Sequence, residues 1–209
     1  MAAVSLRRYT NLAALIDLLT TRQITLLSPT LWDDRNDAFF MRQYKNKTGA
    51  RTVLALCFAE THETYHHWRV FSHGPDGVCI EFDKSALIES FADDKCITSK
   101  RVAYRQIPKL STSSVKLNSL PFIKRFPYRD EKEFRIVYTD MTTETEFKKY
   151  DLPLSSIRRV NLSPWMPLSL SDSVRKTIRL IKGCNKLPIS RSTLVDNERW
   201  KQVAASIEP

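Results

Sequence analysis

Apolar and polar residues alternate along the chain with two periods, one typical of helices and one typical of strands. Asn11 to Thr21 carries Leu12, Leu15, Ile16 and Leu19 at helical spacing and predicts a helix capped by Thr10 or Asn11. The segments KSALIESF and SDSVRKTIRLIKG predict two more helices, the first capped by Asp83 and the second by Ser171 or Asp172. The predicted strands are QITLLSP, RTVLALCFA, VCIEFD, ITSKRVAYR, EFRIVYTD, DLPLSSIRRVNLSP and LPISRSTL. This mixture favours one α+β domain over residues 1–209, with a mixed and split β-sheet flanked by helices around a cleft.

The composition excludes several classes of protein. The longest apolar runs are too short to span a bilayer, and the N-terminus lacks the apolar stretch of a signal peptide, so we expect a cytoplasmic protein without a membrane partner. With only 4 Gly, the chain contains neither GxGxxG nor GxxxxGK[ST], which disfavours nucleotide binding through those loops. Its 4 Cys form no CxxC pair, which disfavours a zinc ribbon or finger.

The net charge is +10 and the pI is near 9.6. A positive surface of this size attracts polyanions, so we expect nucleic acid as the first class of partner and an acidic protein or lipid as the second. Many of the basic residues are also typical of solvated helix and strand faces. The sequence does not indicate an oligomeric state.

Three histidines lie within six residues at His62, His66 and His67, and HETYH fits the HExxH pattern of zinc proteases. On a helix, His62 and His66 would share a face and suit a metal, with Glu63 as the base. The alternative is a polar junction between a strand and a helix. We favour this alternative and predict no metal site, because the segment is short and no third ligand follows.

Two further clusters have both a structural and a functional interpretation. In WDDRND, which begins with Trp32, the carboxylates of Asp33, Asp34 and Asp37 surround Arg35 and could bind a cation or orient an arginine. A turn whose carboxylates bind backbone N–H groups is the favoured interpretation. Tyr65, Trp68 and Phe71 are three residues apart and could form one helical face. Such a face is usually core, but it can also stack on a flat ring.

Taken in order, these motifs resemble the bacterial domain of unknown function 2971 family, most closely over residues 7–138. The matching segments are RRYTNLAALIDLLTTRQITLLSP, WDDRND, CFAET, WRVFSHGPDGVCIEFD and EKEFRIV. Trp68 matches the family pattern and Phe71 stands for Tyr. Arg69, Val70 and Pro75 depart from the pattern, and so do Asp33 and Arg35.

The order of segments is also similar, more distantly, to ADP-ribosyltransferases. This resemblance implies an NAD cofactor held by Arg8 and Tyr9, with Tyr65, Trp68 or Phe71 stacked on nicotinamide. It also implies that Glu133 is catalytic, because a fixed carboxylate stabilises the oxocarbenium-like ribose as nicotinamide leaves. Such bacterial enzymes often act as toxins or phage-defence effectors, and the implied target is a macromolecule.

Strand alternation places Glu131, Glu133 and Arg135 on one face, opposite Phe134 and Ile136. Glu133 is therefore either a catalytic carboxylate facing a cavity or half of an ordinary Glu–Arg pair on an exposed strand face. Three functions remain open from the sequence: NAD-dependent ADP-ribose transfer, a non-catalytic nucleic-acid-binding or protein-interaction domain, and a zinc hydrolase built on HETYH.

Overall fold

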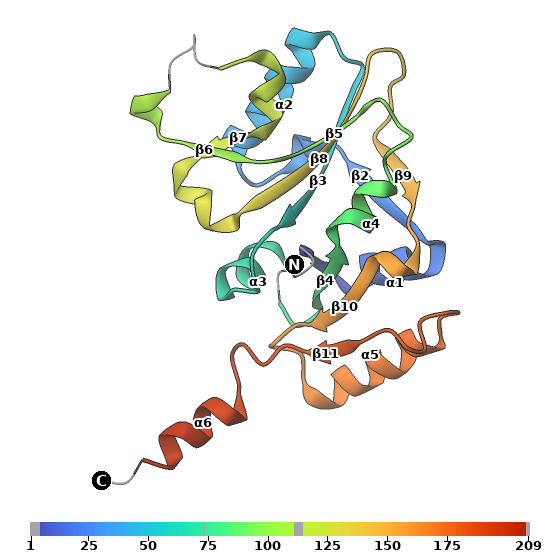
Figure 1. Cartoon of the computed structure of the whole chain (residues 1–209), viewed down its shortest axis with the longest axis vertical. Coiled ribbons are helices and arrows are strands. Elements are labelled where there is room, and N and C mark those ends of the chain that lie inside the picture. Colours follow the sequence, from blue (N-terminus) through green and yellow to red (C-terminus); the bar gives the residue numbers. More distant parts are fainter. Residues whose placement is uncertain (1–4, 73, 111–114, 208–209) are drawn as a thin grey trace. The chain divides into compact units, whose positions relative to one another are not determined.

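A computed structural model of the chain (Figure 1) describes residues 5–72, 74–110 and 115–207. It confirms the α+β class, with a mixed, mostly antiparallel sheet and flanking helices. The contacts divide the chain into two compact units, each built from separate segments. Unit 1 is Met1–Arg8, Arg22–Thr61 and Phe82–Ser156, and unit 2 is Tyr9–Thr21, His62–Glu81 and Ile157–Pro209. That residues 1–209 act as one domain stays a prediction.

The sheet of unit 1 is centred on β3 (Thr52–Ala59), which pairs along its whole length with β8 (Glu133–Asp140). Both strands are almost entirely buried, which explains their nearly continuous apolar sequences. Unit 1 also contains the first four residues of β1 (Ser5–Asn11), where Arg7 pairs with β3; the rest of β1 belongs to unit 2. Its remaining strands are β2 (Gln23–Leu27) beside β3, β9 (Phe147–Asp151) beside β2, β5 (Ile97–Arg101) beside β8, and the parallel pair β6 (Ala103–Arg105) and β7 (Ile123–Arg125).

Helix α2 (Arg35–Thr48) covers one face of β3 and β8 in unit 1. It packs with the 3-10 segment Leu117–Phe122 over an apolar cluster that includes Met41, Phe122 and Val137. This helix was not predicted from the sequence, because only Asp37 and Met41 of its residues are buried and the apolar stripe is therefore too weak. The second helix of the unit, α4 (Lys84–Glu89), begins at the predicted cap Asp83.

Unit 2 contains strands β4 (Gly77–Asp83, shared with unit 1 at its last two residues), β10 (Ile157–Leu162) and β11 (Ile189–Arg191), with β10 and β11 parallel. Its helices are α1 (Leu12–Thr21), α3 (Tyr65–Phe71), α5 (Leu168–Leu180) and α6 (Glu198–Ala205). Asn11 caps α1 as predicted. Helix α5 begins at Leu168 and not after the expected cap, because Ser171 is buried inside its first turn.

No helix within the described ranges combines the length and the apolar composition needed to cross a membrane.

Candidate functional site

The guanidinium of Arg135 lies at the centre of a buried charged cluster in unit 1. Its Nε and Nη2 donate to Glu133 Oε1 at 2.8 and 2.7 Å, and its Nη1 and Nη2 bind the two oxygens of Asp37 at 3.0 and 2.7 Å. Nη1 also donates to the carbonyl of Pro121, and the ring of Trp32 lies 4.6 Å from the guanidinium carbon. Arg135 is fully buried, so these contacts replace its hydration.

Lys124 adds a second cation to this cluster. Its Nζ lies 2.6 Å from Glu131 Oε2, 3.5 Å from Glu133 Oε2 and 3.8 Å from Asp37 Oδ2. Three carboxylates therefore share two cations, which leaves one net negative charge in a nearly dry environment. Glu133 Oε1 is held by Arg135, whereas its Oε2 lies 3.5 Å from Lys124 Nζ. The thiol of Cys57 also forms a hydrogen bond with the Glu133 carboxylate.

The backbone explains how two glutamates at the entrance of β8 come to share one lysine. Glu131 ends the 3-10 helix Phe126–Glu131, Lys132 adopts φ 44°, and Glu133 begins the strand. The hydroxyl of Tyr104 accepts the backbone N–H of Glu133 at 2.8 Å and fixes this turn. The alternation of Glu133 and Arg135 onto one face is confirmed. The alternative of an exposed Glu–Arg pair is wrong, because α2 and Pro121 cover that face.

The three carboxylates differ in their ionisation. Burial pushes the pKa of Glu133 upward, but the charges of Arg135 and Lys124 outweigh it, so the pKa lies below its usual range. For Asp37 and Glu131, burial prevails over the nearby cations and raises the pKa. Glu133 is therefore the carboxylate of the three most firmly held as an anion.

Arg8, on β1 in unit 1, is half-buried and differs from the paired cations. Burial lowers its pKa to about 10, and no carboxylate of the described residues forms an ion pair with it. Its neighbour Arg7, by contrast, donates to the carbonyl of Thr61 at 2.6 Å. A desolvated guanidinium without a counter-charge is a favourable binding partner for an anionic ligand.

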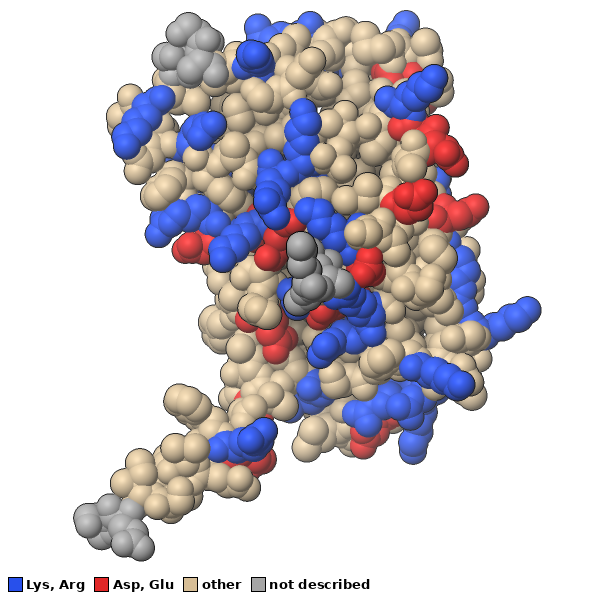
Figure 2. Space-filling view, viewed as in Figure 1, with Lys and Arg blue, Asp and Glu red and all other residues tan. Residues whose placement is uncertain are grey.

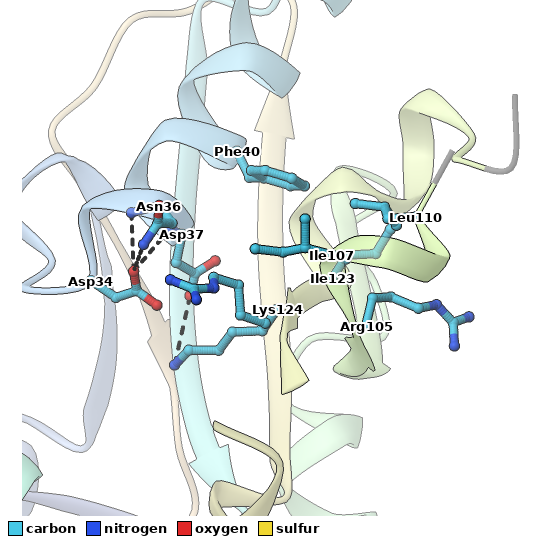
Figure 3. A pocket seen from close by; sticks show the side chains of 10 residues that line it. Asp34, Asn36, Asp37, Phe40, Arg105, Ile107, Leu110, Ile123 and Lys124 are labelled. Atoms are coloured by element: carbon cyan, nitrogen blue, oxygen red, sulfur yellow. Dashed lines mark hydrogen bonds and ion pairs between the residues drawn. The ribbon is translucent and has the colours of Figure 1, made fainter. Parts of the chain in front are cut away.

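A small hollow of about 40 Å³ opens beside the cluster, between the first turn of α2 and the apolar side chains of Phe40, Ile107 and Ile123 (Figure 3). Asp34 Oδ1 caps α2 by accepting the N–H groups of Asn36 and Asp37, which is the turn interaction that the sequence predicted. Asp34 Oδ2 is buried, and none of the described residues donates to it. The hollow can hold a few water molecules that would satisfy this oxygen, but it is too small for a dinucleotide.

The predicted stacking residues lie in unit 2, where they differ in exposure. Trp68 is fully buried, its Nε1 donates to Glu63 at 3.1 Å, and its ring meets Tyr9 edge-on, so it packs as core. Tyr65 is 53% exposed and Phe71 is 37% exposed, so these two rings are accessible to a ligand. Tyr9 also stacks on the buried His67 at 5.3 Å.

The histidine segment forms the polar junction that the sequence favoured. His62 precedes α3, while His66 and His67 lie within it, and Thr64 caps the helix. Glu63, the base of the zinc alternative, instead accepts hydrogen bonds from Trp68 and Ser192. Within the described residues no group of three or more His, Cys, Asp or Glu side chains is arranged to hold a metal ion. His73 lies outside the described residues.

The structure thus brings Trp32, Asp37 and Glu133 together in unit 1. Sequence reasoning missed Lys124, which lies in a weakly patterned segment and carries no motif of its own. It also missed that Asp37 binds Arg135, 98 residues away, because it considered only Arg35 within the same segment.

The comparisons with known proteins concern part of the sequence and the overall fold. The model of the family described as "Protein of unknown function (DUF2971)" matches residues 67–136. A search of curated proteins found no match. Among solved structures, DarT of Thermus sp. 2.9 in complex with NAD+ is similar with a TM-score of 0.47 and 9% identity, covering 92% of this chain and 96% of DarT. The complex of the same protein with carba-NAD+ gives a TM-score of 0.46 and 10% identity, covering 92% and 97%.

The matched segment contains Lys124, Glu131, Glu133 and Arg135, four of the five residues that form the charged cluster. The resemblance seen in the motifs is therefore confirmed for residues 67–136, which match the DUF2971 family.

Proposed function

We propose that this chain uses NAD to transfer ADP-ribose to a macromolecule. The observation that carries the proposal is Arg8, a half-buried guanidinium on β1 that forms no ion pair with a carboxylate of the described residues and whose pKa burial lowers. The pyrophosphate of a dinucleotide would serve as the counter-ion of the Arg8 guanidinium. Charge-assisted hydrogen bonds between a guanidinium and phosphate are strong. The sequence resemblance to ADP-ribosyltransferases implies the same role for Arg8.

Glu133 provides the second requirement of the reaction, an anion held in place before the substrate arrives. The bond between nicotinamide and ribose breaks with its electron pair leaving on nicotinamide, and the ribose becomes an oxocarbenium-like cation. A target oxygen or nitrogen then attacks the anomeric carbon and releases a proton. Glu133 is ionised and fixed by Arg135, so its Oε2 can accept a hydrogen bond from a ribose hydroxyl and stabilise the developing charge.

The stacking residues and the biological role follow from the resemblance, and the target class follows from the charge. Tyr65 and Phe71 are the exposed candidates for stacking on nicotinamide. Nucleic acid is the target class that the positive charge favours, and a toxin or phage-defence effector is the biological role. The alternative is a binding module without catalysis, for which no NAD consumption is expected.

The test measures NAD binding by calorimetry and nicotinamide release by the purified chain. Glu133→Gln should lower kcat by about 10²- to 10³-fold while NAD binding is retained, because Gln keeps the shape and removes the charge. Arg8→Gln should instead weaken NAD binding about 10- to 100-fold, since it removes a charge-assisted contact.

Glu60→Gln and Arg51→Gln are the matched controls. Glu60 is an ion-paired carboxylate of unit 1 that contacts Lys84 and Arg101, and Arg51 is an exposed arginine of the same unit. Both variants should behave as the wild type. A wild-type chain that binds no NAD, or a folded Glu133→Gln variant with full turnover, would overturn the proposal.

A further inference from the structure

A groove of about 750 Å³ lies in unit 1 along β5, β6 and the 3-10 segment Leu117–Phe122. Five basic side chains line it and no acidic residue does; they are Lys100, Arg101, Arg105, Lys109 and Lys116. Figure 2 shows Lys and Arg side chains gathered over this part of the molecule. Positive charge is thus concentrated along this groove, which favours a polyanionic partner.

Most of this charge is not used within the protein. Lys100, Arg105, Lys109 and Lys116 are exposed, and no carboxylate of the described residues forms an ion pair with any of them. Only Arg101 is paired, with Glu60. Outside the groove, Lys84, Lys124 and Lys148 each bind a carboxylate. Four cations of the groove can therefore neutralise phosphates without breaking an ion pair with a carboxylate of the described residues.

Aromatic rings lie among these cations. Tyr104 and Phe126 line the groove and are partly exposed. The hydroxyl of Tyr104 is anchored by the backbone N–H of Glu133, so its ring is fixed in place. Unpaired bases can stack on such rings, whereas the paired bases of a duplex are already stacked on each other. Rings interleaved with free cations are typical of surfaces that bind single-stranded nucleic acid.

We propose that this groove of unit 1 binds a single-stranded nucleic acid, with the four unpaired cations on its phosphates and Tyr104 and Phe126 against its bases. Binding of the strand in the groove does not require transfer of ADP-ribose. The Glu133→Gln chain should therefore bind the strand as the wild type does, and loss of NAD turnover would not affect this result.

The test is fluorescence anisotropy with labelled mixed-sequence oligonucleotides of DNA and RNA, each as a single strand and as a duplex, over a range of salt concentrations. Four phosphate contacts predict a slope of log K against log salt of about −2.8 for a single strand. The variant K100A/R105A/K109A/K116A should weaken binding about tenfold or more at low salt and bring the slope close to zero.

The control variant K47A/K149A/K176A/K186A removes the same charge from exposed lysines outside the groove and should leave affinity and slope nearly unchanged. Thermal unfolding shows that both variants are folded. An equal loss of affinity in the two variants would mean that only net charge matters, and equal affinity for the duplex would exclude a single-strand site. Either result overturns the proposal. A wild-type chain that binds no oligonucleotide overturns it as well.

Discussion

Arg135 shows how a single residue can organise a site from distant parts of the chain. Its guanidinium binds Glu133 two residues away and Asp37 98 residues away, and it is fully buried. A buried ion pair adds little stability compared with apolar residues of the same volume, but removing one partner leaves the other charges uncompensated. The sequence predicted the pairing of Glu133 with Arg135 from strand periodicity, whereas the contact with Asp37 depends on tertiary structure.

Arg135→Met should lower the free energy of unfolding by about 3–5 kcal/mol, because Asp37 and Glu133 would remain buried with only Lys124 nearby. Urea denaturation measures this change. Arg159→Met is the control, since Arg159 is largely exposed and pairs with Glu81 at 3.5 Å; its effect should stay within about 0.5 kcal/mol. Similar losses in both variants would contradict the central role of Arg135.

Glu131 and Glu133 should show opposite pH dependences. The pKa of Glu133 is lowered by folding, so its contribution to stability is present above the ordinary glutamate pKa and is lost as the pH falls. The pKa of Glu131 is raised, so its contribution is present at low pH and is lost as the pH rises through the raised value.

Relative to the wild type, Glu133→Gln should therefore lose stability as the pH rises toward 4.5, and Glu131→Gln should gain stability as the pH rises above 4.5. Denaturation curves at several pH values from about 3 to about 7 test both trends. Parallel trends in the two variants would contradict the assigned ionisation states.

At the scale of elements, the sequence predicted best where a segment is buried on both faces or carries a cap. Strands β3 and β8 follow from apolar runs, and α1 and α4 follow from Asn11 and Asp83. Helix α2 was missed because its exposed residues outnumber its buried ones and hide the helical period. The same difference applies to the charged cluster. The shared face of Glu133 and Arg135 on β8 was predicted from the sequence, whereas the contribution of Asp37 from α2 was not.

The first turn of α2 depends on one carboxylate of the WDDRND segment. Asp34→Ala should destabilise unit 1 by about 1 kcal/mol, because the N–H groups of Asn36 and Asp37 lose their acceptor. Asp33→Ala is a matched control, since the exposed Asp33 makes no cap. The two unfolding midpoints in urea distinguish them, and an equal shift would show that the cap contributes nothing.

At the scale of the whole molecule, the mixture of helical and strand patterns predicted the α+β class, and the net charge predicted an attraction to polyanions without locating the positive surface. The net charge of +10 became informative only when the groove of unit 1 showed which cations are unpaired. The division of the chain into two units also could not be predicted from composition, because each unit is built from separate segments of the chain.

The C-terminal helix α6 contributes no buried side chain, and Trp200 is 80% exposed. A chain that ends at Asp196 should therefore unfold within about 0.5 kcal/mol of the full chain in urea. A chain that ends at Lys186 removes β11, which pairs with β10 and buries Ile189, and should be clearly less stable. A large loss from the first truncation would show that α6 supports the fold.

The positive φ of Lys132 has a consequence for how this segment can vary. Glycine adopts this conformation without steric cost and asparagine does so readily, whereas valine, isoleucine and threonine resist it. Lysine therefore occupies this position at a steric cost that glycine would not have. Among relatives that conserve both flanking acids, we expect glycine or asparagine to replace it freely, while branched residues should be absent from this position.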